Sequence, residues 1–66
     1  SMNRLMTLEE VANYLSLSKD TIYRMANAGK IPASKVGSQW RFRKGDVDQW
    51  LDKNMNVRRD DIPNSK

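Results

Sequence analysis

Two short segments with helical periodicity, separated by three residues, constrain the fold of this chain more than any other feature. In the first segment, apolar residues recur at positions i, i+3, i+4 and i+7 and share one helical face: Leu8, Val11, Ala12 and Leu15. The preceding Thr7-Leu8-Glu9-Glu10 matches the T-x-x-E capping box, in which Thr7 caps the helix and Glu10 reaches back. This pattern predicts a helix over residues 8–15.

The second segment begins at Ser18, a residue type favoured at helix N-termini, and ends at Gly29, which suits the left-handed residue after a helix. Apolar residues at helical spacing form the side that we expect to be buried: Ile22, Met25 and Ala26. Two short helices joined by a turn of about three residues form a helix-turn-helix arrangement. We expect Leu17, within the turn, to fill the space between the helices.

Beyond the second helix the pattern becomes extended. Pro32 cannot continue a helix, and residues 34–36 and 39–43 follow as two strand-like segments. Gly37-Ser38 between them suits a two-residue type II′ turn with glycine at its first central position. In the second segment the side chains alternate between a buried aromatic face and an exposed, mainly basic face: Trp40 and Phe42 against Gln39, Arg41 and Arg43.

A third helix is predicted over residues 45–53, with an apolar face made by Val47, Trp50 and Leu51. The fold class is therefore mainly α with a small β-hairpin, in the order α-α-β-β-α. The chain divides into three parts: an N-terminal arm over residues 1–6, whose Ser1 we interpret as a cloning remnant, a folded domain over residues 7–53, and a flexible tail or linker over residues 54–66.

The positive charge is concentrated in one stretch. Lys19–Lys44 holds seven basic residues and one acid, a net charge of +6, whereas the rest of the chain has five basic and seven acidic residues, a net charge of −2. A positive surface on rigid elements is typical of nucleic-acid-binding proteins.

Size and composition argue against an enzyme. The chain has 66 residues, which is one small domain, and it contains neither histidine nor cysteine, so common bases, nucleophiles and metal ligands are missing. We expect no catalytic activity and no cofactor, and we interpret Asp46, Asp48 and Asp52 as a solvated acidic face rather than a metal site. Since no apolar run could span a bilayer, we expect a cytoplasmic protein without a membrane partner.

Two longer patterns carry a family resemblance: TLEEVANYLSLSKDTIYRMANAGKIP, and then KVGSQWRFRKGDVDQWL. Over Met6–Asp52 the chain resembles the excisionase-type helix-turn-helix domain, which is related to the DNA-binding domain of MerR-type regulators. The resemblance implies a winged helix-turn-helix fold whose second helix enters the major groove and whose hairpin wing reaches an adjacent groove or the backbone. It also implies a location at the nucleoid, with integrase or another DNA-bound protein as a possible partner.

On the second helix, Asp20, Tyr23, Arg24 and Asn27 lie opposite the apolar side. Arg24 is a candidate for pairing with guanine and Asn27 for pairing with adenine. Three residues near the helix start are candidates for phosphate contacts: Ser18, Lys19 and Thr21. Two alternatives stay open, because Arg24 can instead pair with Asp20 four residues earlier, and Tyr23 can either contact a phosphate or pack against the wing.

On and before the hairpin, basic and polar side chains are further candidates for DNA contact: Lys30, Lys35, Ser38, Gln39, Arg41 and Arg43. The alternative is a solvated basic edge that prevents strand-to-strand aggregation. Because no acid occurs between Lys30 and Lys44, we favour contact with the DNA backbone or minor groove. Arg41 is the strongest candidate, since the aromatic residues on either side of it fix its direction.

The sequence thus predicts a sequence-specific protein that binds double-stranded DNA, either an excisionase-type recombination directionality factor or a small transcription regulator. No small-molecule effector is expected. The alternatives are a winged-helix module that binds a protein partner, and a DNA-binding fragment of a larger regulator.

Overall fold

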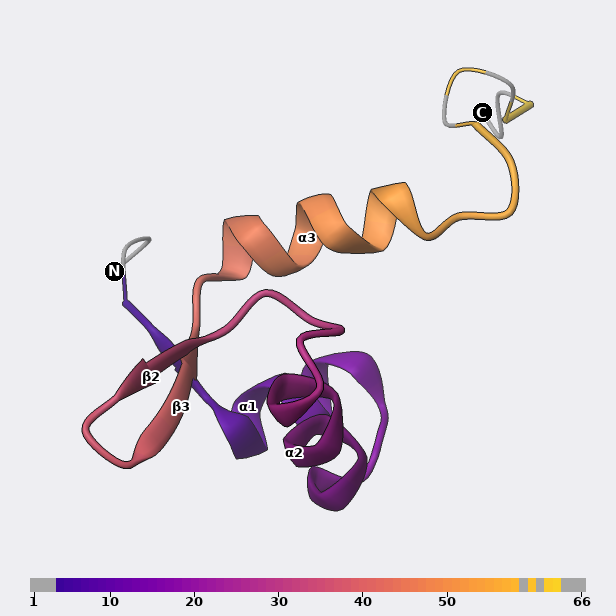
Figure 1. Ribbon diagram of the computed structural model, residues 1–66. Helices are drawn as coiled ribbons and strands as arrows, with labels where there is room; N and C mark the ends of the chain where they lie inside the picture. Colours follow the sequence, from indigo (N-terminus) through magenta and orange to yellow (C-terminus); the bar gives the residue numbers. More distant parts are fainter. Residues whose placement is uncertain (1–3, 59, 61, 64–66) are drawn as a thin grey trace.

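The computed structural model describes residues 4–58, 60, 62 and 63 (Figure 1). Its elements follow in the order β1 (Met6–Thr7), α1 (Leu8–Leu15), α2 (Lys19–Asn27), β2 (Ser34–Val36), β3 (Gln39–Phe42) and α3 (Lys44–Lys53). The predicted order α-α-β-β-α is confirmed, and a short strand that was not predicted precedes it. The interpretation of Ser1, and the part of the predicted tail at residues 59, 61 and 64–66, lie outside the described residues.

Both predicted helix caps are confirmed. The Thr7 hydroxyl accepts a hydrogen bond from the Glu10 backbone N–H at 3.1 Å, and the Glu10 carboxylate accepts one from the Thr7 N–H at 2.9 Å. The Ser18 hydroxyl accepts from the Thr21 N–H at 3.1 Å. These bonds satisfy backbone donors that have no partner within the helix, so they fix where α1 and α2 begin.

The turn between the helices differs from the prediction. Ser16 adopts the left-handed conformation, with φ 59° and ψ 40°, and the Leu17 N–H donates to the Ala12 carbonyl at 2.9 Å, which closes α1. The Leu17 side chain is 44% exposed, so the prediction that it fills the space between the helices is wrong. The backbone bond ends the helix, and buried side chains of α1 and α2 themselves fill that space.

The sheet has three antiparallel strands in the order β1-β3-β2. The predicted hairpin β2–β3 is confirmed, and Met6 and Thr7 pair with Phe42 and Arg41, which makes β3 the central strand. Gly37 has a φ of 63°, whereas Ser38 is not among the described residues with a positive φ. A type II′ turn requires this combination, with a positive φ at its first central residue only. A β-carbon at Gly37 would meet nothing within 4 Å, so this position needs glycine for its φ.

The core lies where the helix pair, the sheet and α3 meet. Its buried residues come from every helix, β3 and the segment after α2: Val11, Ala12, Ile22, Ala26, Ile31, Phe42 and Val47. In Figure 1, α3 (orange) runs across the top, and the hairpin and α2 lie below it. α3 begins one residue before the predicted start, and Leu51 on its predicted apolar face is 39% exposed. None of the helices in the described part of the chain is both long and apolar enough to span a membrane.

Candidate nucleic-acid interface

A groove of about 440 Å³ separates α2 from the hairpin wing, β2–β3 with its turn. Five of the predicted contact residues line it: Lys19, Tyr23, Ser38, Gln39 and Arg41. Trp40 of the wing lines it as well, and so do three residues at the end of β1 and the start of α1: Thr7, Leu8 and Glu9. The sequence reasoning missed this contribution from the start of α1, because it depends on β1 pairing beside β3.

Burial of one side of α2 determines which side chains reach this groove. Ile22 and Ala26 are buried, and Met25 is half-buried against the core. Tyr23 is 48% exposed and lines the groove next to the wing. The Ser18 hydroxyl, besides capping α2, donates to the Thr21 hydroxyl at 2.8 Å, so the structure ties together two predicted phosphate contacts.

Arg24 lies on a different side of α2 from the groove. It lines a second hollow, of about 320 Å³, together with Thr21, Lys30 and apolar atoms of α2. Its guanidinium lies 3.2 Å from the Asp20 carboxylate, and the two side chains are 72% and 75% exposed. Such an exposed pair contributes only about 0.3–0.5 kcal/mol, so DNA can displace Asp20 from Arg24 at low cost.

Hydrogen bonds hold Arg41 in the wing. Its guanidinium donates to the Trp40 carbonyl at 2.9 Å and to the Gln39 side-chain oxygen at 2.6 Å. Both acceptors are neutral, so Arg41 keeps its net positive charge at the groove. The side chain of Arg41 was predicted to be oriented by the aromatic residues on either side of it. In the structure, these local hydrogen bonds orient its guanidinium.

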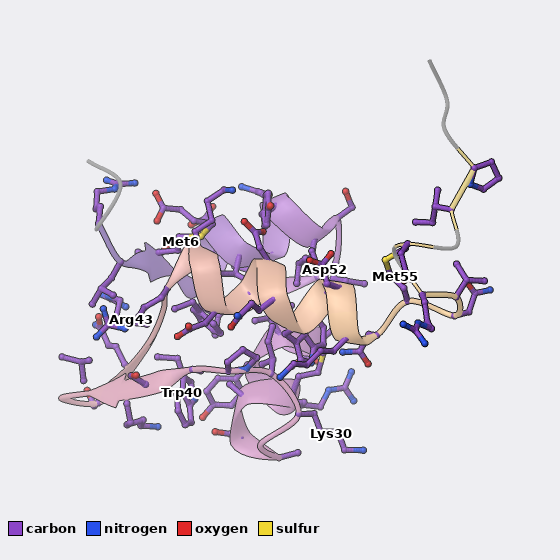
Figure 2. All side chains as sticks on the ribbon, turned by 90° about the horizontal axis from the view of Figure 1, so that it is seen from above. Met6, Lys30, Trp40, Arg43, Asp52 and Met55 are labelled. Atoms are coloured by element: carbon purple, nitrogen blue, oxygen red, sulfur yellow. The ribbon has the colours of Figure 1, made fainter. Side chains whose placement is uncertain are left out.

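Trp40 connects the wing to α2. Its indole N–H donates to the Asn27 side-chain oxygen at 3.1 Å, and the Lys35 ammonium lies 4.6 Å from the centre of its ring. In Figure 2, Trp40 lies on the hairpin at the side toward α2, with the labelled Arg43 and Lys30 on opposite sides of it. Arg43 and Lys30 are both exposed and neither lines the groove of α2 and the wing.

A second polar cluster joins α1 to α3. The Tyr14 hydroxyl donates to one Asp48 oxygen, and the Lys44 ammonium donates to the other at 3.0 Å. The hydrogen bond from Tyr14, followed by that from Lys44, holds the pKa of Asp48 below its ordinary value. Asp48, which was predicted to lie on a solvated acidic face, therefore also links α3 to α1 through its hydrogen bond with Tyr14. In the described part of the chain, no group of three or more carboxylates could hold a metal ion.

The comparisons with known proteins agree with this architecture. A family model described as a helix-turn-helix domain matches residues 5–55. Rv0500A of Mycobacterium tuberculosis, named a "putative DNA-binding protein", is 37% identical over 49 residues, which are 74% of this chain and 63% of that protein. MT0521, from a second strain of the same species, has the same name and the same figures.

The uncharacterized protein YvgK of Bacillus subtilis is 43% identical over 44 residues, which are 67% of this chain and 14% of that protein. The chain thus spans less than two thirds of the length of these relatives. No solved structure matches it significantly. Because the family model covers most of the chain and the structure has the two capped helices and the hairpin, the chain belongs to the helix-turn-helix domain family.

Proposed function

We propose that this chain binds double-stranded DNA in a sequence-specific manner, with α2 in the major groove and the β2–β3 wing on an adjacent groove or the backbone. The observation that carries the proposal is the groove between α2 and the wing, which is lined by Lys19 and Arg41 against one carboxylate, Glu9, in a chain of the helix-turn-helix domain family. Relatives named as putative DNA-binding proteins support it as well. We propose binding and no catalysis, since histidine and cysteine are absent.

In this proposal one side of α2 contacts phosphates and another side contacts bases. Lys19, the first residue of α2, lies in the groove with Arg41, where a phosphate backbone would be attracted to both charges. Arg24 lies on the other side of the helix, and its guanidinium matches the two acceptors that guanine presents in the major groove. Phosphate contacts would hold the protein in register, and Arg24 would supply base preference.

Backbone amide chemical shifts, recorded while random duplex DNA is added at low salt, test where DNA binds. We expect shifts in α2 and the wing, with α3 largely unchanged. Shifts confined to α3 would favour the alternative, a module that binds a protein partner. No shift anywhere would contradict DNA binding itself.

Selection of binding sites from a random duplex library tests specificity. We expect one enriched sequence, and Arg24→Ala should relax the preference at one base pair, at a cost of ~1–3 kcal/mol there. Lys53→Ala, which removes a charge from the end of α3, is the control and should leave the preference unchanged. Equal weakening on every sequence by Arg24→Ala would show that Arg24 only anchors a phosphate.

For the biological role of DNA binding, we propose either a recombination directionality factor, which acts beside an integrase, or a transcription regulator. In the second case the chain could be the DNA-binding part of a larger regulator. The two roles use the same interface but differ in what they do to DNA. An architectural factor bends its site, so fluorescence energy transfer between the ends of a bound duplex separates them. A straight duplex in the complex would argue against the recombination role.

A further inference from the structure

We propose that the Asn27–Trp40 hydrogen bond is the joint that sets the wing against α2, so that Asn27 is a positioning residue and not a reader of adenine. This inference rests on the proposed DNA binding and assigns a role within that interface. It replaces the base-reading role that the sequence pattern suggested for Asn27.

The joint is defined by the chemistry of its two groups. An indole N–H can only donate a hydrogen bond, so the Asn27 atom that it meets at 3.1 Å is the side-chain oxygen. The bond joins the last residue of α2 to the central strand of the sheet. It therefore links the helix that would enter the major groove to the strand that carries Arg41.

The position of Asn27 argues against base reading. Recognition helices contact base edges mainly from their N-terminal residues, whereas Asn27 is the last residue of α2. Pairing with adenine needs the asparagine oxygen as acceptor and its amide nitrogen as donor on one edge. In this structure that oxygen already accepts from Trp40, which turns the amide group toward the wing.

The outer strand of the wing has little burial of its own. All three residues of β2 are exposed, and Val36 is 53% exposed. Lys35 is the direct partner of Trp40 in the strand register, and its ammonium lies 4.6 Å from the centre of the Trp40 ring. Trp40 thus contacts α2 through its N–H and β2 through its ring face, so both wing strands are tied to the helix at one side chain.

Breaking the joint should weaken binding without changing what is read. A wing that moves freely against α2 must be ordered when DNA binds, and this cost is the same for every sequence. Because the bond is present in the free protein, its loss acts on binding only through this ordering cost, and we expect roughly a two- to tenfold loss of affinity.

The experiment compares Asn27→Ala, which removes the acceptor, with Trp40→Phe, which removes the indole donor and keeps an aromatic ring. We expect both variants to lose affinity by a similar factor, roughly two- to tenfold, on selected and random duplexes alike. The double variant should be no weaker than the weaker single variant, because one bond is lost in each case. In the free protein, both changes should increase fast motion of the Gly37-Ser38 turn, measured by backbone amide relaxation.

Trp50→Phe on α3 serves as the control, since it removes the chain's other indole, which does not line the groove of α2 and the wing. It should leave the turn and the affinity unchanged. The inference is overturned if Asn27→Ala changes the preference at one base pair while Trp40→Phe does not, or if neither variant alters the turn in the free protein. Failure of the proposed function looks different, because the unaltered chain would then show no binding to duplex DNA.

Discussion

Replacing Lys19 by glutamine should reduce the salt dependence of duplex binding by about one unit of slope, whereas the same change at Lys53 should leave it unaltered. Both side chains are exposed and carry one positive charge, so the two variants have the same net charge. Lys19 lines the groove between α2 and the wing, and Lys53 is the last residue of α3. The comparison therefore separates local phosphate contact from overall charge.

The magnitude follows from the charges that α2 and the wing present. Six cationic side chains lie on these elements or beside them: Lys19, Arg24, Lys30, Lys35, Arg41 and Arg43. If each meets a phosphate, log affinity should fall with log salt at a slope of about −5, so raising salt from about 50 to 200 mM costs about 10³-fold in affinity. If Arg24 contacts guanine, as proposed, or stays paired with Asp20, five phosphate contacts remain and the slope is about −4.5.

Fluorescence anisotropy of a labelled duplex, titrated at several salt concentrations between about 50 and 200 mM, measures the slope directly. Thermal unfolding of each variant shows that both remain folded. A slope near zero for the unaltered protein would refute the electrostatic argument. Equal slopes for Lys19→Gln and Lys53→Gln would show that DNA does not follow the groove of α2 and the wing.

Three further predictions concern affinity and stability. Asp20→Asn should tighten duplex binding by about two- to threefold at low salt. The substitution releases Arg24 from a pair that contributes ~0.3–0.5 kcal/mol, and it removes a negative charge that repels DNA. Weaker binding in the same anisotropy assay would contradict this prediction. Ser16→Gly should stabilise the fold by about 0.5–1 kcal/mol and raise Tm by roughly 2–8 °C, because a φ of 59° costs a residue with a β-carbon more than it costs glycine. An unchanged or lower Tm would refute this prediction. The pKa values of Glu10 and Asp48 are held below their ordinary values of 4.5 and 3.8, the first mainly by the Thr7 N–H and the second mainly by the Tyr14 hydroxyl. The stabilisation of the fold by these two carboxylates is therefore complete above their ordinary pKa values, and it is lost as pH falls through the lower pKa values of the folded protein. Urea unfolding should show that the free energy of unfolding falls below about pH 4, and that it falls less steeply in Asp48→Asn.

The local structure of the helices and the turn could be predicted from the sequence. Thr7 and Ser18 cap their helices through bonds that span three residues, and the apolar spacing defines the buried sides of α1 and α2. The positive φ of Gly29 and Gly37 likewise follows from glycine at the end of a helix and in a tight turn. These features were predictable because the interacting groups lie within a few positions of one another, so residue type and spacing are sufficient.

How the parts of the candidate interface meet could not be predicted, because it depends on contacts between residues far apart in the chain. The pairing of Met6 with Phe42, which brings the start of α1 to the groove, involves too few residues to leave a periodic pattern. The partners Asn27 and Trp40 are 13 positions apart, and nothing in either local sequence indicates that an exposed asparagine will accept from a wing indole. Contacts of this kind depend on how helices and strands pack around a shared core, and this packing directs Asn27 toward the wing.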